Sequence, residues 1–243
     1  MDSRRLARAI DDTMRRHDAL RSVFSGDSAS ARFEVQAEAP ATQVIAVDSM
    51  PDGDGELWQL GPPRIRPDRE PCFRAAVITD GTEHALLIRS HQFVMDGTSL
   101  AVVARDISRQ YRGEAGTPPA ASYADFAMWQ RNWLDGPARD AFRQYWQREL
   151  CGANRLPLPC QDKRVLTGDL RTSTVTAAVS RECAAGIAAI RRDGFSVHTI
   201  AVGAFAITAA RMYGVPDVVT GSPTANRVLP EFASMAGFSR TAS

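Results

Sequence analysis

The sequence lacks the features that mark several classes of protein. It has only four histidines, and its four cysteines lie far apart without a CxxC pair: Cys72, Cys151, Cys160 and Cys183. Neither a disulfide framework nor a zinc site is therefore indicated, and we expect no metal. The formal net charge is +1, which offers no attraction for nucleic acid or for an anionic membrane surface.

Long apolar runs are also missing. The longest mostly apolar stretch, residues 199–212, is too short and too rich in Ala and Gly to span a bilayer. The N-terminus is a charged amphipathic stretch and does not read as a secretory signal. We find no internal repeat and no low-complexity tract. A soluble, cytoplasmic protein is therefore expected, whose 243 residues form one good core or two small ones.

The part of the chain around which the rest is organised is residues 83–100, EHALLIRSHQFVMDGTSL. Its continuous apolar run, ALLI, suits a strand that is buried on both faces. A helix is predicted over residues 100–112, with Thr98 or Ser99 as its cap and Gly113 as its stop. The stretch therefore predicts a strand, a short connection and a helix.

Four polar or turn-forming residues lie in that connection: His91, Gln92, Asp96 and Gly97. Polar groups at a junction between two rigid elements are well placed to act as a site. The residues alone leave another interpretation open, which is an ordinary strand end followed by an Asp-Gly turn.

Hydrophobic periodicity predicts further elements in the first half of the chain. Leu6, Ile10 and Met14 are spaced by four residues and predict an amphipathic helix over residues 3–17. Residues 51–71 are rich in Pro, Gly and Asp, which favours a loop. Strands are expected over residues 19–24, 32–35, 43–47, 72–79 and 83–90, the last two joined by the turn Asp80-Gly81.

The second half alternates between predicted helices and strands. Residues 151–171 are aperiodic and predict a linker. Helices are expected over residues 123–130, 141–150, 182–192 and 197–213, and strands over residues 172–179 and 217–221. Because strands and helices alternate beyond the linker, we expect a second α/β lobe.

Several short motifs carry a family resemblance. The segment HQFVMDG resembles the HHxxxDG signature of condensation domains of nonribosomal peptide synthetases and their acyltransferase relatives: His91 matches the first His, Asp96 and Gly97 match the DG, and Gln92 replaces the second His. Four further pieces resemble family motifs and occur in the family's order. RRHDALRSVF resembles RHExLRTxF, and YADFAMWQ resembles YxDYAxWQ. GSPTANR resembles GSPxAxR, and MAGF resembles the start of MIGFFVNT.

The resemblance implies a chloramphenicol-acetyltransferase-like α/β sandwich fold. Residues 1–160 would form a nearly complete first lobe and residues 161–243 a partial second lobe. The family's opening strand would precede Met1, and its second lobe continues beyond the MAGF segment. We therefore expect a chain cut at both ends, whose incomplete lobe is covered by neighbouring domains or by an oligomer, because it would otherwise expose apolar surface.

The resemblance also implies a reaction, in which an acyl or peptidyl thioester on one carrier domain is joined to an amine on another. The phosphopantetheine arms would belong to these partner carrier domains, and this chain would bind no cofactor itself. His91, Gln92, Asp96 and Gly97 are the candidate catalytic residues.

Gln92 departs from the family pattern at the position where a His acts as a base or orients the amine. A Gln amide donates and accepts hydrogen bonds but does not accept a proton near neutral pH. An α-amino group has a pKa of roughly 7.7 to 8.0 and is partly neutral at working pH. Gln92 can therefore position an amine, and we expect amide formation to be favoured over ester formation.

The resemblance further implies an ion pair between the motif Asp and an Arg of the RHExLRTxF piece. By matching position this pairs Arg16 with Asp96, with Arg21 as the second basic residue of the piece. A buried carboxylate needs such a charged partner, and a planar guanidinium supplies one. Trp146 and Ser99 are the candidate substrate-binding residues.

Two other functions stay open. Gln92 and the incomplete lobe are compatible with a catalytically inactive relative that serves as a docking or recruitment module. The HHxxxDG signature is also shared by stand-alone, polyketide-associated O-acyltransferases, which act on a free alcohol. Restoring His at position 92 and assaying condensation separates an active domain from a docking module.

Overall fold

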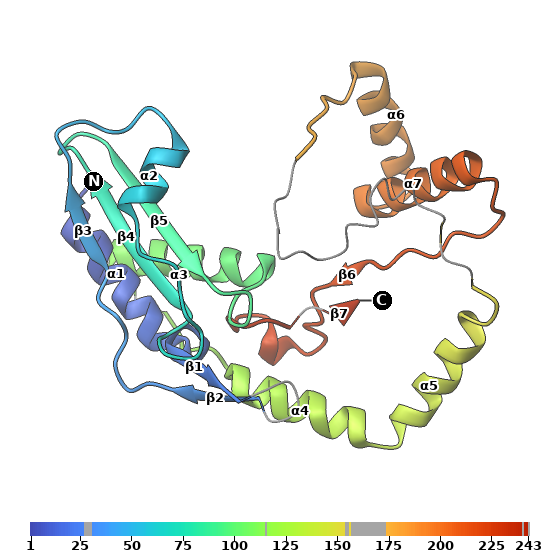
Figure 1. Ribbon diagram of the computed structural model, residues 1–243, viewed down its shortest axis with the longest axis horizontal. Coiled ribbons are helices and arrows are strands. Elements are labelled where there is room, and N and C mark those ends of the chain that lie inside the picture. Colours follow the sequence, from blue (N-terminus) through green and yellow to red (C-terminus); the bar gives the residue numbers. More distant parts are fainter. Residues whose placement is uncertain (27–30, 115, 154–155, 157–173, 240, 243) are drawn as a thin grey trace, which may run out of the picture. The chain divides into compact units, whose positions relative to one another are not determined.

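The structure is a computed structural model that describes residues 1–26, 31–114, 116–153, 156, 174–239 and 241–242 (Figure 1). The chain divides into two compact units, one of Met1–Asp140 with Pro223–Ser243 and one of Ala141–Ser222. The boundary at residue 160 that the sequence predicts lies outside the described residues, so the division into lobes 1–160 and 161–243 stays a prediction.

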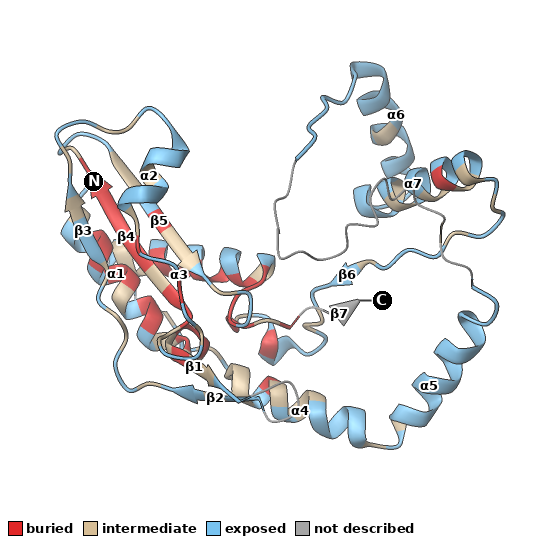
Figure 2. Ribbon diagram, in the orientation of Figure 1, coloured by how far each residue is buried: buried red, intermediate tan, exposed pale blue. Residues whose placement is uncertain are grey.

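A three-stranded sheet of order β3-β4-β5 forms the centre of the first unit. Strand β3 (Gln43–Ala46) runs parallel to β4 (Phe73–Thr79), and β4 pairs antiparallel with β5 (His84–Ser90). The Asp80 carboxylate accepts hydrogen bonds from the Thr82 and Glu83 amides in the connecting turn. The predicted hairpin is therefore present, and β4 is buried along most of its length (Figure 2).

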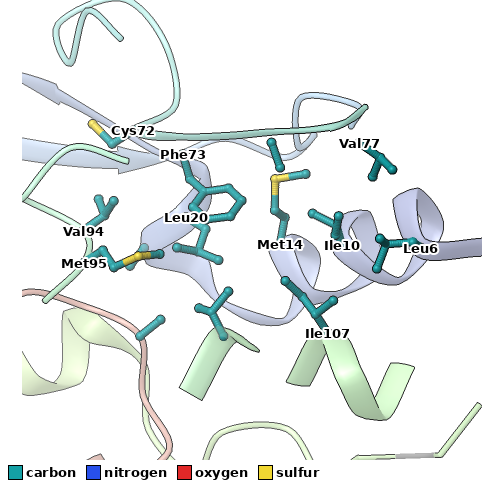
Figure 3. Close-up of a cluster of buried hydrophobic side chains, with 14 residues drawn as sticks. Leu6, Ile10, Met14, Leu20, Cys72, Phe73, Val77, Val94, Met95 and Ile107 are labelled. Carbon is teal, nitrogen blue, oxygen red and sulfur yellow. The ribbon is translucent and has the colours of Figure 1, made fainter. Parts of the chain in front are cut away.

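Helix α1 (Ser3–Arg16) covers one face of this sheet. Asp2 caps it by accepting a hydrogen bond from the Arg5 amide at 3.0 Å. The predicted apolar side of the helix faces the strands and packs into one cluster with β4 side chains (Figure 3); the cluster includes Leu6, Ile10, Met14, Phe73 and Val77. The periodicity of four residues thus predicted both the helix and its buried face.

Helix α3 (Gly97–Arg112) lies against α1 and adds Val103 and Ile107 to the same core. It ends as predicted at Gly113, which has a φ of 77° in the left-handed region. The Gly113 amide donates to the Gln110 carbonyl at 3.0 Å. Because only glycine adopts this conformation without strain, Gly113 stops the helix.

The segment after α1 differs from the prediction of a strand over residues 19–24. Residues Asp18–Arg21 form a short 3-10 helix, and strand β1 (Ser22–Ser25) begins only after it and pairs with β2 (Arg32–Val35). The Ser22 hydroxyl donates to the Asp18 carbonyl at 2.9 Å, which closes this tight turn. A side chain-to-backbone bond of this kind competes with extended backbone, and sequence periodicity does not reveal it.

The stretch of residues 51–71, predicted as a loop, contains helix α2 (Asp54–Leu60). Its first turn carries Asp54 and Glu56, whose charges suit a helix N-terminus. None of its residues is buried. The helix therefore has no buried apolar side whose periodicity would reveal it in the sequence.

Helix α4 (Tyr123–Asp135) completes the first unit together with the C-terminal segment. Ser122 and Asp125 form a capping box at its start. Its Phe126 packs with Phe232 and Met235 in a second, smaller cluster. The C-terminal segment contains the short 3-10 helix Pro230–Phe232 and the paired strands β6 (Pro223–Thr224) and β7 (Thr241–Ala242).

The second unit contains most of α5 (Ala138–Glu149), followed by α6 (Arg181–Arg192) and α7 (Val197–Tyr213). These helices were predicted, but the described residues 174–179 and 217–221 do not form the predicted strands. A strand requires a neighbour for its backbone hydrogen bonds, and the described part of this unit supplies none. The residues of α6 and α7 are mostly exposed (Figure 2).

No single helix among the described residues is long and apolar enough to cross a membrane. The pair α6 and α7 meets that test of length and composition only when joined, and the two helices are bent by 117° at the break between them.

Candidate functional site

The site is built on the turn between β5 and α3. The His91 amide donates to the Cys72 carbonyl at 2.8 Å, and the Val94 amide donates to the His91 carbonyl at 3.1 Å. Val94 and Met95 are buried in the core cluster. These two side chains anchor the turn in the core, whereas Gln92, earlier in the same turn, is exposed. We call residues 91–92 the crest of the turn.

Asp96 starts helix α3. Its Oδ1 atom accepts hydrogen bonds from the Ser99 amide at 2.7 Å and lies 2.8 Å from the Ser99 hydroxyl. The helix therefore begins at Gly97, earlier than predicted, and its cap is Asp96 and not Thr98 or Ser99. A carboxylate that reaches the amide three residues on is an effective N-cap, so the Asp of the motif shapes the turn locally.

The ion-pair partner of Asp96 is Arg227. Its two terminal guanidinium nitrogens lie 3.0 and 3.2 Å from the two carboxylate oxygens of Asp96. The Asp96 side chain is 0% exposed and that of Arg227 is 6% exposed. A bidentate pair of this kind is the arrangement in which a buried carboxylate is satisfied.

Arg16 and Arg21, which the family resemblance pairs with Asp96, have other partners. Arg16 donates to the carbonyls of residues 116 and 117, and its Nε lies 3.9 Å from an Asp106 oxygen. Arg21 binds Asp18 at 2.6 Å and the carbonyl of residue 36. The expectation is corrected, because the last turn of α1 directs Arg16 towards α3 and the 3-10 turn keeps Arg21 in local contacts.

The C-terminal segment closes over the same carboxylate. The Ser239 hydroxyl donates to Asp96 Oδ2 at 3.2 Å, and the Gly237 carbonyl oxygen lies 2.8 Å from the Ser99 hydroxyl. Arg227 also lies 2.9 Å from that hydroxyl. One polar network thus joins three parts of the first unit. These are the motif turn, residues 225–227 and residues 235–239. Figure 1 shows the backbone of these segments between α3 and β6.

This network keeps Asp96 ionised. Burial on its own raises the pKa of the Asp96 carboxyl, but the hydrogen bonds from Arg227 and Ser99 outweigh it and hold the pKa below its usual value of 3.8. A carboxylate that is fully paired and has no exposed surface does not exchange protons with a substrate. We therefore assign Asp96 to shaping the site.

The orientation of the His91 imidazole is fixed by contacts within the turn. Its Nδ1 atom lies 3.2 Å from the Phe93 amide and accepts its hydrogen, so the ring proton resides on Nε2. Burial lowers the pKa of the His91 imidazole. The ring packs edge-on against Phe93, with centroids 4.3 Å apart. His91 thus stiffens the crest that carries Gln92.

The two candidate substrate-binding residues have different surroundings. Ser99 is 0% exposed and its hydroxyl is engaged by Asp96 and Arg227, so the structure places it in the polar network and not on a substrate-facing surface. Trp146 lies on α5 in the second unit, is 40% exposed, and packs edge-on against Tyr145. A role for Trp146 in substrate binding stays a prediction.

Arg227 and Ser239 were not identified from the sequence as site residues. The GSPTANR segment ends on Arg227 after Asn226, which has a positive φ of 48°. The sequence signal that could have identified Arg227 is its place as the last residue of a recognised motif. Ser239 has no comparable signal, since its contact with Asp96 depends on the tertiary fold.

Two other kinds of group, metal ligands and a reactive Cys72, can be checked among the described residues. No group of three His, Cys, Asp or Glu side chains there is arranged to hold a metal ion. Burial raises the pKa of the Cys72 thiol to about 11, so this cysteine is no nucleophile near neutral pH.

Comparison with known proteins supplies the family context. A family model described as "Condensation domain" matches residues 1–239. Malpinin synthetase from Mortierella alpina is 30% identical over 96% of this chain, which spans 3% of that protein. The solved condensation domain of the monacolin K polyketide synthase MokA has a TM-score of 0.81 at 22% identity, over 100% of this chain and 58% of that one.

A third similar structure is the complex of the X-domain and OxyB from teicoplanin biosynthesis. It has a TM-score of 0.81 at 24% identity, over 100% of this chain and 56% of the other. At these identities the solved structures establish the fold, which is α/β as predicted. The chain spans less than two thirds of the solved structures and a few per cent of the synthetase it matches.

Proposed function

The chain belongs to the condensation domain family, and from this premise we propose that it joins an acyl or peptidyl thioester to an amine to form an amide. Both substrates are presented on phosphopantetheine arms of partner carrier domains. The chain itself binds no cofactor, and it acts in the cytoplasm as part of, or beside, a synthetase.

The observation that carries this proposal is the locked turn beneath Gln92. The start of α3 is fixed by the contacts of Asp96 with Arg227 and Ser99, and Val94 in the same turn is fully buried. The crest with His91 and Gln92 is therefore presented by rigid elements on both sides, which is the requirement for a group that must position a reacting amine.

Gln92 positions the amine without taking its proton. Its side-chain oxygen can accept a hydrogen bond from an amine and its NH2 can donate to a developing oxyanion. Because the acceptor amine is partly neutral at pH 8, such positioning is sufficient for attack on a thioester. The C–S bond breaks as the C–N bond forms, and the departing phosphopantetheine thiolate takes up the proton that the amine loses. His91 and Gly97 contribute the shape of the turn, and Trp146 of the second unit is a candidate substrate-binding residue.

A comparison of Gln92 variants tests this role. The chain is mixed with a carrier domain loaded with an acyl thioester and a second carrier loaded with an amino acid, and the product is followed by the mass of the acceptor carrier. We expect Gln92→Ala to lower the rate about 10- to 100-fold, since positioning and one hydrogen bond to the transition state are lost. Gln92→His should keep or raise the rate.

Gln147→His on the exposed surface of α5 serves as the matched control and should leave the rate unchanged. An amide product from the wild-type chain that is formed equally fast by Gln92→Ala would contradict the role of Gln92. A chain that forms no amide with either residue at position 92, under conditions where both carriers bind, would overturn the condensation proposal itself.

A docking function is the second candidate. It is favoured by Gln92, which removes the proton-accepting side chain, and by the fold shared with an X-domain that was solved in complex with OxyB. In this case the chain binds a partner protein and neither Gln92→His nor the wild type forms product. A free alcohol in place of the acceptor carrier tests the O-acyltransferase alternative in the same assay, with an ester as its product.

A further inference from the structure

Two of the sequence motifs have no part in the reaction proposed above. One is YADFAMWQ, whose Tyr123 begins helix α4, and the other is MAGF, whose Gly237 lies near the C-terminal end of the described chain. The structure brings these two residues together within the first unit. Their contact leads directly to the network around Asp96.

Tyr123 supports the backbone of residues 237–238 in two ways. Its hydroxyl donates a hydrogen bond to the Phe238 carbonyl at 3.1 Å. Its ring lies so close to Gly237 that a Cβ atom there would clash with the ring carbon Cδ2. A contact this close excludes any side chain at position 237, so glycine is required for the backbone to reach the ring.

Gly237 in turn contacts the groups that hold Asp96. Its carbonyl oxygen lies 2.8 Å from the Ser99 hydroxyl and 3.3 Å from a terminal nitrogen of Arg227. Its amide lies 3.1 Å from the same hydroxyl. A shift of the Gly237 peptide therefore changes both the cap of α3 and the guanidinium that pairs with Asp96.

The charge environment of Tyr123 is consistent with this closeness. Burial raises the pKa of the Tyr123 hydroxyl, and the negative charge of Asp96 raises it further. The hydroxyl therefore stays protonated and keeps its hydrogen for the Phe238 carbonyl. Tyr123 also stacks on Phe126, with ring centroids 6.2 Å apart, which ties it to the second apolar cluster.

We propose that Tyr123 is a positioning residue for the proposed active-site turn, acting through Gly237 on Ser99, Arg227 and Asp96. The effect on catalysis rests on the condensation function proposed above, whereas the effect on the turn does not. The Tyr123 ring and hydroxyl limit how far the backbone of residues 237–238 can shift, and this fixes the position of the Gly237 peptide relative to Ser99 and Arg227.

The first experiment measures hydrogen exchange at the Ser99 amide, which Asp96 holds at 2.7 Å. Tyr123→Phe removes the hydroxyl and keeps the ring. We expect exchange to accelerate about 2- to 12-fold, the range that corresponds to losing one net hydrogen bond. The control is Tyr111→Phe, which removes a hydroxyl that accepts from the Asp2 amide near the other end of α3 and should leave Ser99 unchanged. Equal exchange in both variants would overturn the proposal.

The second experiment tests the ring contact by a double-mutant cycle. Gly237→Ala places a Cβ against the Tyr123 ring, so exchange at Ser99 should rise strongly. Adding Tyr123→Ala removes the obstacle, and the double variant should exchange more slowly than the product of the two single effects predicts. Independent, multiplying effects would show that the ring does not act through Gly237.

The third experiment links the turn to the reaction. In the carrier-loaded assay, Tyr123→Phe should lower kcat about 2- to 12-fold, the same loss of one hydrogen bond, with KM unchanged, because the residue touches no substrate. A variant that loses stability without this split of kcat against KM would contradict a positioning role. If the wild type forms no amide, the condensation proposal fails while the exchange measurements still decide the role of Tyr123.

Discussion

At the scale of single residues, the arginine that neutralises the buried motif carboxylate comes from a distant part of the chain. Arg227 and Asp96 are 131 positions apart, and no local pattern links them. The family resemblance correctly implied that the Asp needs a guanidinium. It implied Arg16 as the source, but the Arg16 side chain contacts Asp106 and the carbonyls of residues 116 and 117, not Asp96.

Substituting Asp96 tests the energetic weight of this pair. Asp96→Asn leaves the buried Arg227 charge without its partner, and the free energy of unfolding of the first unit should fall by about 3–5 kcal/mol. Asn is itself a good helix cap, so the loss reports the ion pair. Urea unfolding, followed by hydrogen exchange of the β4 amides, measures it.

Asp12→Asn is the matched control, because the Asp12–Arg15 pair is more than half exposed on both sides. Exposed pairs of this kind contribute about 0–1 kcal/mol. If both variants lose the same small amount, Asp96 is not the structural centre of the site.

The buried His17 makes stability depend on pH. Its Nε2 lies 2.9 Å from Asp106 Oδ2, with Arg16 and Asp18 nearby. Burial lowers the pKa of His17 below 6.5, more than the Asp106 carboxylate raises it. The unfolded chain therefore binds a proton at His17 at higher pH than the folded chain does, so stability is present above pH 6.5 and falls as the pH drops through the folded value.

Replacing this imidazole by a group that does not titrate removes the effect. His17→Gln should flatten the decline in urea midpoint below pH 6.5 relative to the wild type, even if its midpoint at pH 8 is lower. Midpoints measured at several pH values between 8 and 5 give both slopes. Parallel slopes would show that His17 does not titrate differently in the folded chain.

At the scale of secondary-structure elements, the sequence predicted what local patterns encode. The spacing of Leu6, Ile10 and Met14 identified α1. The apolar run before His91 identified β5, but the expectation that this strand is buried on both faces was wrong, because Leu87 alone of its residues is buried. The sequence did not predict α2, an exposed helix within a Pro- and Gly-rich stretch, nor did it predict that residues 217–221 form no strand. An exposed helix has no buried stripe to reveal it, and a strand depends on a neighbour that periodicity does not show.

The candidate site divides in the same way. The turn and its residues His91, Gln92, Asp96 and Gly97 were found from contiguous sequence. The contacts that hold the turn, above all those of Arg227, arise from long-range packing. Local propensity carries no information about such contacts.

The end of α3 provides a test of backbone conformation. Gly113 has a φ of 77°, and an alanine there adopts the left-handed region at a cost of about 1–2 kcal/mol. Gly113→Ala should therefore lower the free energy of unfolding by that amount. Gly97→Ala, at the start of the same helix, meets nothing within 4 Å and has no positive φ, so it should change stability little. Equal losses would assign the effect to the added methyl group and not to the backbone.

At the scale of the whole molecule, the two units differ in how much apolar surface they bury. The first has a continuous core of α1, α3 and the central sheet. In the second, large side chains of α7 such as Phe205, Ile207 and Met212 are more than half exposed. Short helices without a packed face are marginally stable in water, so the units should respond differently to the same substitution.

Replacing one isoleucine by alanine in each unit tests this difference. Ile10 is 0% exposed and Ile207 is 57% exposed. Ile10→Ala should lower the free energy of unfolding of the first unit by about 2–5 kcal/mol, whereas Ile207→Ala should change it by no more than about 0.5 kcal/mol. Exchange of the β4 amides reports the first unit in both variants. A comparable loss from Ile207→Ala would show that the stability of the first unit depends on α7.

The contacts of Asp96 with Arg227 and Ser239 also affect how the polypeptide acquires its fold during synthesis. A nascent chain that has passed α4 already contains Asp96 and Ser99, but Arg227 and Ser239, which complete the contacts of this carboxylate, have not yet been translated. Until the ribosome has passed residue 227, the ionised Asp96 carboxylate at the start of α3 lacks its guanidinium partner. Closing a loop of this length then delays the final step further, so translation sets the earliest moment at which the turn bearing Gln92 can mature.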